Sequence, residues 1–196
     1  MTQQTIIAIG REYGSAGHEI AEKIADDLEI ALYDRRLLDE LAQKYGMDPK
    51  VLEKMEESPR NHFLSRKVKG YSNSLADAVS ELQFNFIKEK ADAGESFVIV
   101  GRCAEIVLKD YKCMTSVFVL GDYDSKLKRI MDKYNLNKDE ASQKMARHDR
   151  KRKAYHNAYS KYHWGDSRGY DLCVNSSHFG IEATAKLIEG FVASKM

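Results

Sequence analysis

The N-terminal region combines a short apolar segment, a glycine-rich loop and an amphipathic stretch, and this order restricts the folds that the chain can adopt. Residues 5–9, TIIAI, are apolar and mostly β-branched and stop at Gly10, which predicts a buried strand running into a loop. Residues 18–30 then repeat apolar side chains at helical spacing. A buried strand followed by a loop and a covering helix predicts the first unit of an α/β fold.

Strand-like and helix-like segments continue to alternate along the rest of the chain. The further predicted strands are residues 31–33, 97–101, 115–121 and 170–175. The further predicted helices are residues 34–46, 49–58, 74–93, 123–134, 137–159 and 181–194. Because helical crossovers of this kind join parallel strands, the pattern predicts a three-layer α/β sandwich with a central parallel sheet of about five strands. A chain of 196 residues without an internal repeat is expected to form one domain.

Composition and charge argue against several classes of protein. A hydrophobic content of 43% with only 2 prolines is typical of a folded globular chain rather than a disordered one. A net charge of +1 provides no overall attraction to nucleic acid or to a membrane, so neither is an expected partner. The absence of a basic leader and of a long apolar run predicts a cytoplasmic protein. Cys103, Cys113 and Cys173 form no C-x-x-C pair, which suits a reducing compartment and offers no zinc framework.

The loop at residues 10–18 falls where parallel sheets bind ligands, beyond the carboxyl end of a strand. Gly14 and Gly17 can adopt backbone angles that let successive amides converge, and the following helix adds the positive end of its dipole. The arrangement predicts a phosphate-binding loop. A glycine pair after a strand is also common in loops that bind nothing, so the loop alone leaves both interpretations open.

The end of this loop departs from the usual phosphate-binding sequence, in which glycine is followed by lysine and then serine or threonine. Here Gly17 is followed by His18 and Glu19. Lysine normally brings a fixed charge to the outer phosphates, and the hydroxyl binds Mg²⁺. His18 is cationic only in part near neutral pH, and Ser15 is the hydroxyl left to bind a metal. The other interpretation of His18 is an ordinary polar residue in a first helical turn.

A second candidate region is residues 147–153, RHDRKRK, with 5 basic residues against 1 acidic residue in a predicted helix. Helical spacing predicts that Arg147 shares a face with Arg150 or Lys151, while Arg152 points elsewhere. Arginines can stabilise the charge that spreads over a transferring phosphoryl group. The alternatives are a solvated basic helix and a nucleic-acid contact, and the low net charge argues against the second.

Four passages, taken together and in this order, resemble the cytidylate kinase-like family, a branch of the P-loop nucleoside monophosphate kinases. They are IGREYGSAGHEIA, LYDRRLL, FVIVGRCAEIVL and RHDRKRKAYHNAYSKYHWGDSRGYDLCVNSS, and the resemblance runs from residue 5 to about residue 192. It implies a P-loop kinase domain over residues 1–196, with a helical acceptor-side insert at about 47–93 and a helical lid at about 137–168. The implied activity is phosphoryl transfer from ATP, with Mg²⁺, to a nucleoside monophosphate, CMP or dCMP being the first expectation.

The resemblance also implies roles for individual residues. The residues expected to hold the donor phosphates are Arg11, Gly14, Ser15, Ala16, Gly17 and His18, with Ser15 as the metal ligand. Those expected to bind the acceptor are Asp34, Arg35, Arg102 and Asp171. The expected catalytic residues are His18 and the lid arginines Arg147, Arg150 and Arg152. Plainer alternatives are a helix cap for Asp34, a surface guanidinium for Arg102 and a turn residue for Asp171.

Three further expectations concern the less regular regions. Residues 61–73 are expected to form a loop over the acceptor cleft, in which Phe63 and Tyr71 are candidates for base stacking. The aromatic run Tyr155, Tyr159, Tyr162 and Trp164 favours core or interface packing over base stacking. Interface packing could support a homodimer. The hypothesis from a different functional class is a regulatory module that binds nucleotide without kinase turnover.

Overall fold

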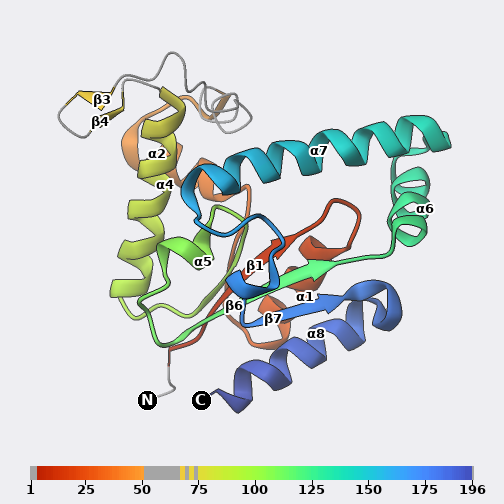
Figure 1. Cartoon of the computed structure of the whole chain (residues 1–196). Helices are drawn as coiled ribbons and strands as arrows, with labels where there is room; N and C mark the ends of the chain where they lie inside the picture. The colour runs from red at the N-terminus through yellow and green to blue at the C-terminus, as the bar shows by residue number, and fades with distance from the viewer. Residues whose placement is uncertain (1–3, 51–66, 69–70, 73–74, 196) are drawn as a thin grey trace.

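A parallel sheet of 5 strands forms the centre of the computed structural model, which describes residues 4–50, 67–68, 71–72 and 75–195 (Figure 1). The strands are β1 (Ile6–Arg11), β2 (Ala31–Tyr33), β5 (Phe97–Val100), β6 (Met114–Leu120) and β7 (Leu172–Asn175). Their order in the sheet is β2-β5-β1-β6-β7, and every pair is parallel. The predicted α/β fold with a parallel sheet is confirmed, and each predicted strand is present.

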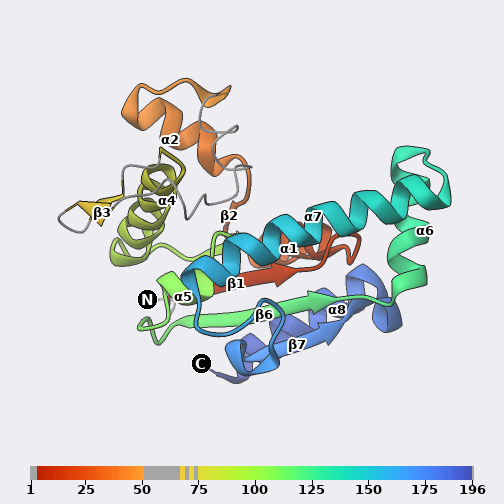
Figure 2. The same cartoon turned by 45° about the horizontal axis from the view of Figure 1, so that its top comes forward.

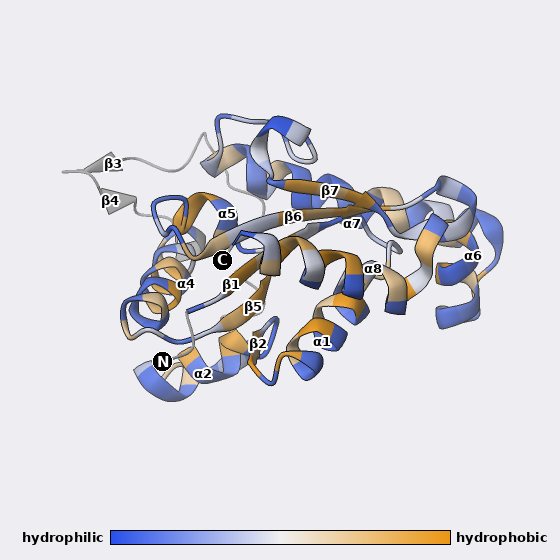
Figure 3. Ribbon diagram, turned by 90° about the horizontal axis from the view of Figure 1, so that it is seen from below, coloured by the Kyte–Doolittle hydropathy of each residue, from blue (hydrophilic) through white to orange (hydrophobic). Residues whose placement is uncertain are grey.

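Helices cover both faces of this sheet (Figure 2). Those that cover it are α1 (Gly17–Asp27), α2 (Leu37–Tyr45), α4 (Leu75–Asp92), α5 (Ala104–Val107) and α8 (Ser176–Ser194). Successive side chains of a strand point to opposite faces, so Ile6 and Ala8 of β1 pack with α2, α4 and α5, whereas Ile7 and Ile9 pack with α1 and α8. Burial on both sides explains why β1 is an unbroken apolar run, and Figure 3 shows the strands as mostly hydrophobic.

Two further helices, α6 (Tyr123–Tyr134) and α7 (Lys138–Tyr159), form an arm beside the sheet. They pack on each other through a small apolar cluster of Leu127, Ile130, Ala141 and Met145. A capping box fixes the start of α7, because the Asn137 side chain accepts from the Glu140 amide and the Glu140 side chain accepts from the Asn137 amide. From this arm α7 runs back over the loop that follows β1 (Figures 1 and 2).

The structure differs from the predicted elements in three places. It adds α5, which is too short to show a helical period, and the antiparallel pair β3 (Lys67–Val68) and β4 (Tyr71–Ser72) inside the segment expected to be a loop. It also starts α8 at Ser176 rather than at residue 181, across a kink at Gly180, whose φ is 74°. Most of the helix predicted at 49–58, and the side chains of Phe63 and Tyr71, lie outside the described residues. Of the helices described, none has the length and hydropathy needed to cross a membrane.

Candidate functional site

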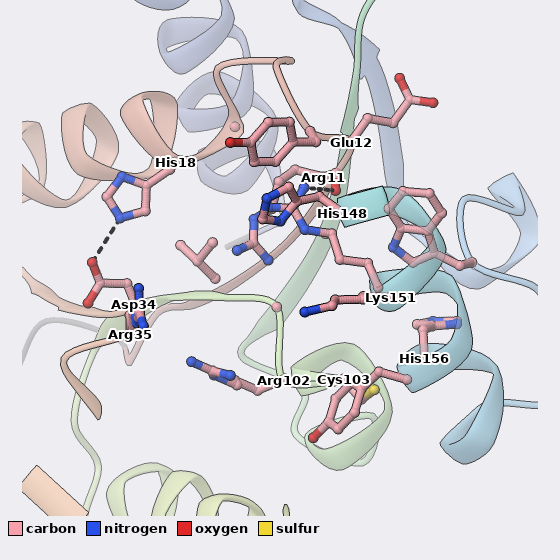
Figure 4. Close-up of a pocket in the computed structure, with 18 of the residues that line it drawn as sticks. Arg11, Glu12, His18, Asp34, Arg35, Arg102, Cys103, His148, Lys151 and His156 are labelled. Atoms are coloured by element: carbon pink, nitrogen blue, oxygen red, sulfur yellow. Dashed lines mark hydrogen bonds and ion pairs between the residues drawn. The ribbon is translucent and has the colours of Figure 1, made fainter. Parts of the chain in front are cut away.

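A pocket of about 530 Å³ lies at the carboxyl ends of β1, β2 and β5, where a parallel sheet is expected to bind ligands. The loop after β1 forms one wall, and the segments that follow β2 and β5 form the opposite one. Side chains from α6 and α7 close the remaining side. Figure 4 shows labelled side chains from the end of β1 and its loop, from α1, from the segments after β2 and β5, and from α7 gathered around one space.

The loop after β1 has a backbone suited to anions. Gly14 has a φ of 87°, and the Lys126 side chain lies 3.1 Å from where a Cβ would stand, so glycine is required there for both reasons. Ala16, with a φ of 59°, leads directly into α1 at Gly17. The Ile20 amide makes the first helical bond, to the Ala16 carbonyl. The amides of Gly17, His18 and Glu19 therefore lie in the first turn of α1, where helices bind phosphate.

His18, which stands where a lysine is usual, contacts two carboxylates. Its Nε2 lies 2.8 Å from an Asp34 carboxylate oxygen, and its Nδ1 lies 3.3 Å from Glu22 Oε2. Burial by itself would raise the pKa of Asp34, but hydrogen bonds from the Arg36 amide, His18 and the Arg36 guanidinium lower it below its usual value. The Asp34 carboxylate is thus held by His18 of α1 and by Arg36, two residues further along the chain (Figure 4).

Three arginines from distant parts of the chain converge on the pocket: Arg11 at the end of β1, Arg102 after β5 and Arg152 on α7. Burial lowers the pKa of Arg102 to about 10. Burial, and then repulsion from Arg152 and Arg102, lowers the pKa of Arg11. Burial also lowers the pKa of Arg152, which donates to the Arg11 carbonyl at 3.2 Å. A bound polyanion would relieve this repulsion, so the cluster favours ligands that carry phosphate groups.

The turn after β5 aims Arg102 at this cluster. Gly101, Arg102 and Cys103 have successive φ values of 77°, 59° and 51°, so three residues in a row are left-handed. This conformation is costly for the two residues that carry side chains, and such strain is concentrated at functional sites. The turn ends at Ala104, whose amide donates to the Gly101 carbonyl. The apolar strand followed by Gly-Arg-Cys is the sequence signal that pointed to Arg102.

Helix α7 contacts the loop after β1 through Tyr13. The His148 ring stacks on the Tyr13 ring with 4.2 Å between centroids, and the Arg152 guanidinium lies 5.4 Å from the centroid of the same ring. The Asp149 carboxylate accepts from the Tyr13 amide at 2.7 Å. Burial, and then the nearby Arg152 and Arg147, lower the pKa of His148 to about 4. None of Tyr13, His148 and Asp149 was predicted from the sequence, because the contact joins segments 136 residues apart.

The helical spacing predicted for the basic run of α7 is confirmed, since Arg147 and Arg150 share one side and Arg152 points elsewhere, but the side that carries Arg147 and Arg150 does not face the pocket. Arg152 and Lys151 line the pocket, whereas Arg147 and Arg150 are exposed and lie outside its wall. The reason is the apolar side of α7, where Ala141 and Met145 pack against α6 and set the rotation of the whole helix. Steps of three and four residues from these two positions reach His148, Arg152 and His156 on the same side.

Asp171 and Ser15 also lie elsewhere than their expected roles require. Asp171 precedes β7, so it stands at the amino edge of the sheet, opposite the pocket; its carboxylate accepts from Ser116 and pairs with Lys195 at 3.1 Å. Ser15 is buried, and its hydroxyl donates to the Glu12 carbonyl at 2.9 Å. Neither residue lines the pocket. The acceptor role predicted for Asp171 and the metal role predicted for Ser15 therefore do not agree with the structure.

The pocket also contains polar and aromatic side chains that sequence reasoning did not assign to it. Glu105 and His156 form a buried pair, with 2.9 Å between Oε1 and Nε2. Arg129 and Lys133 of α6 add two further cations beside the loop. The aromatic residues on the wall include Tyr155, Tyr159 and Trp164, although core or interface packing was expected for them. Helical periodicity predicted that Tyr155 and Tyr159 lie on α7, but it does not show which other elements their side chains contact.

The carboxylates of the site are distributed rather than clustered. Among the residues that the structure describes, no group of three or more histidines, cysteines or acidic residues could hold a metal ion. Asp34 lies on the pocket wall, and Asp149 lies next to the loop. This arrangement suits Mg²⁺ that arrives with nucleotide phosphates, because Mg²⁺ needs only one or two protein carboxylates in such sites.

Comparison with known proteins points to one family. The model of the cytidylate kinase-like family matches residues 6–178. An uncharacterized protein from Eubacterium ventriosum is similar over 97% of this chain and 99% of its own, with 38% sequence identity and a TM-score of 0.78. No curated protein matches the chain.

Shikimate kinases are similar in fold. The enzyme from Acinetobacter baumannii in complex with shikimate has a TM-score of 0.56 at 15% identity, covering 98% of this chain and 94% of that one. The enzyme from Bacteroides thetaiotaomicron has a TM-score of 0.55 at 12% identity, covering 96% of this chain and 98% of that one. At these identities the likeness shows the fold alone.

Proposed function

The chain belongs to the cytidylate kinase-like family, and we propose that it transfers a phosphoryl group from ATP to a nucleoside monophosphate, with CMP or dCMP as the first candidate acceptor. Membership in this family supports nucleotide-binding phosphotransfer as the general activity. The observation that carries the proposal is the convergence of Arg11, Arg102 and Arg152 on one pocket, whose wall includes the first turn of α1. Amides at a helix N-terminus and buried guanidinium groups together suit a ligand with several phosphates.

The two ends of the pocket support a division between donor and acceptor. The first turn of α1 would hold the donor phosphates, with Arg152 and Lys151 approaching from the lid. Asp34, Arg35 and Arg102 line the opposite side and would orient the acceptor, the two arginines by binding its phosphate. The transferring group would then lie between Arg102 and Arg152, where positive charge stabilises it as the bond to the leaving oxygen breaks.

Phosphoryl transfer requires little covalent chemistry from a protein. Mg²⁺ bound to the nucleotide would neutralise phosphate charge, and Asp34, on the pocket wall, is a carboxylate that would assist in holding it. The chain's own residues would position the reactants and exclude water. The contacts of Tyr13 with α7 support a lid role for that helix, because they hold it against the phosphate loop.

The direct test is ADP release from magnesium ATP across a panel of acceptors. The panel contains CMP, dCMP, UMP, AMP and GMP, together with shikimate and other non-nucleotide alcohols, each compared with a blank that lacks acceptor. We expect release that depends on one pyrimidine monophosphate. Release that depends only on a non-nucleotide alcohol would replace the nucleoside monophosphate assignment while keeping the phosphotransferase one.

A second candidate function is a nucleotide-binding module without turnover. It is favoured by one observation: His18, in the place of the usual lysine, contacts Asp34 and Glu22. In such a module ATP binding would change the contacts of α7, and a partner protein would bind one of the two resulting states. ATP binding measured by calorimetry, with no ADP release for any acceptor of the panel, would favour the module over the kinase.

A further inference from the structure

The phosphate loop lacks the fixed cation that normally reaches the outer phosphates. His18 occupies the lysine position, but its ring nitrogens contact Asp34 at 2.8 Å and Glu22 at 3.3 Å. The next residue, Glu19, is acidic and pairs with Lys133 at 2.9 Å. A cation that serves the donor phosphates must therefore come from another element.

Arg11 reaches the centre of the pocket along a path that two glycines leave open. A Cβ on Gly17 would stand 2.5 Å from the Arg11 Cβ and 3.0 Å from its Cγ, so the start of α1 makes room for the stem of the arginine. A Cβ on Gly101 would stand 2.5 Å from Arg11 Nη1, so the turn after β5 makes room for its head. Real Cβ contacts are not this short. The two glycines therefore leave a channel for the Arg11 side chain, which lines the pocket (Figure 4).

The electrostatic surroundings of Arg11 are those of a ligand site rather than of a structural ion pair. Its strongest charged neighbours are the cations Arg152 and Arg102, and the carboxylates of Asp149 and Asp34 act on it more weakly. A structural arginine is normally held by a dominant carboxylate, because an uncompensated buried charge is costly. A phosphate group between Arg11 and its two neighbours would supply the missing negative charge.

We propose that Arg11 is the fixed cation of this phosphate loop and contacts the donor phosphates in place of the usual lysine. Its guanidinium would enter from the end of β1, through the Gly17–Gly101 channel, rather than from the first turn of α1. The turnover part of this inference rests on the proposed function, whereas the phosphate-binding part does not. His18 is left to position Asp34.

The test measures the affinity of the wild-type protein and of four variants for inorganic tripolyphosphate, ATP and adenosine by calorimetry. The variants are Arg11→Met, Arg11→Lys, His18→Gln and, as a matched control, Lys153→Met on the exposed side of α7. We expect Arg11→Met to weaken tripolyphosphate and ATP binding by about 10- to 100-fold, as loss of charge-assisted hydrogen bonds does. Adenosine binding should not change. Arg11→Lys should recover part of the loss, and His18→Gln and Lys153→Met should each cost less than about threefold.

A measurement on the wild-type chain covers the case in which Arg11→Met does not fold. In protein labelled with ¹⁵N-arginine, the Nε–H resonance of Arg11 is assigned as the one missing from Arg11→Lys, and it should shift when tripolyphosphate is added. A resonance that stays in place would overturn the proposal, as would an Arg11→Met protein that binds tripolyphosphate like the wild type. If Arg11→Met loses phosphate binding and the wild-type protein shows no turnover with any acceptor of the panel, this inference is kept and the kinase is rejected. Turnover unaffected by Arg11→Met would reject only this inference.

Discussion

The two sides of the lid helix α7 carry similar basic side chains but differ in what surrounds them. On the pocket side, Arg152 lies between Tyr13 and the Arg11 carbonyl and is partly buried. On the outer side, Arg147 and Arg150 are exposed. Two charges at the same separation interact several times more strongly in a protein interior than in water. The comparison therefore teaches that the position of a charge, more than its presence in a basic run, decides whether it can serve a phosphate site.

The largest effect expected from this comparison is that of Arg152→Met. Removing a guanidinium that faces a transferring phosphoryl group should lower kcat by about 10³, with a smaller change in KM, because the contact is strongest in the transition state. The measurement is steady-state ADP release with the best acceptor of the panel. Circular dichroism and thermal unfolding check that the fold is kept.

Arg150→Met is the matched control for this substitution, since it removes the same group from the opposite side of α7. It should change kcat by less than about threefold. Equal losses of kcat in the two variants would contradict the assignment of different roles to the two sides, and would restore Arg150 to the catalytic group.

The next effect concerns the contact that holds the pocket side of α7 on the loop. Tyr13→Ala removes the ring that His148 stacks on and that the Arg152 guanidinium overlies. Aromatic pairs and cation–π contacts each contribute about 1 kcal/mol, so losing both should lower amide protection in α7 by about 30-fold. Hydrogen exchange followed by mass spectrometry reports this change. Tyr13→Phe keeps both ring contacts and loses only the hydroxyl bond to Tyr134, so its α7 should exchange like that of the wild type.

Sequence reasoning predicted most of the fold because the signals for it are local. Apolar runs such as residues 5–9 predicted the strands of the sheet, since a strand buried on both faces must be apolar throughout. Helical periods predicted the helices between them. Helix α5 was missed because Ala104–Val107 is too short to show a period. The glycines of the loop were found in the same way, from residues adjacent to a predicted strand, whereas the role expected of Arg102 came from the resemblance to the family.

The parts of the site that sequence reasoning missed depend on how elements meet in space. The rotation of α7 is set by the packing of its residues Ala141 and Met145 against α6, and no pattern within residues 147–153 contains that information. Tyr13 acquires its role only from a lid residue that comes far later in the chain. The acceptor role of Asp171 was implied by the resemblance, but Asp171 precedes β7, whereas ligands bind where parallel strands end.

A smaller effect should appear in the dependence of stability on pH. The pKa of His148 is lowered to about 4 in the folded protein, from about 6.5 in an unfolded chain, so protonation favours unfolding. Above pH 6.5 both states are neutral at this residue and nothing changes. As the pH falls from 6.5 toward 4, the unfolded state binds the proton first and stability is lost. After allowance for the partial exposure of the ring, the loss by pH 5 is about 1 kcal/mol.

His148→Phe tests this account, because phenylalanine can stack on Tyr13 but cannot titrate. The difference in melting temperature between pH 7 and pH 5 should be smaller in the variant than in the wild type. An equal decrease in both proteins would assign the pH dependence to other groups. ATP should weaken the effect in the wild type, because bound phosphate offsets the positive charge of Arg152 and Arg147 that disfavours the protonated ring.

The smallest effect should come from the outer side of α7, and it should depend on salt. Arg147 and Arg150 are exposed, so they can influence an anionic substrate only through water, where the Debye length is about 8 Å at physiological ionic strength. The double variant Arg147→Met, Arg150→Met should therefore raise KM for ATP by less than about twofold at 0.15 M salt and by more at 0.01 M, with kcat unchanged at both. A loss of kcat that persists in high salt would instead mean that one of these arginines reaches the reacting phosphates when substrates bind, and the two sides of the helix would then not differ in the way that the structure implies.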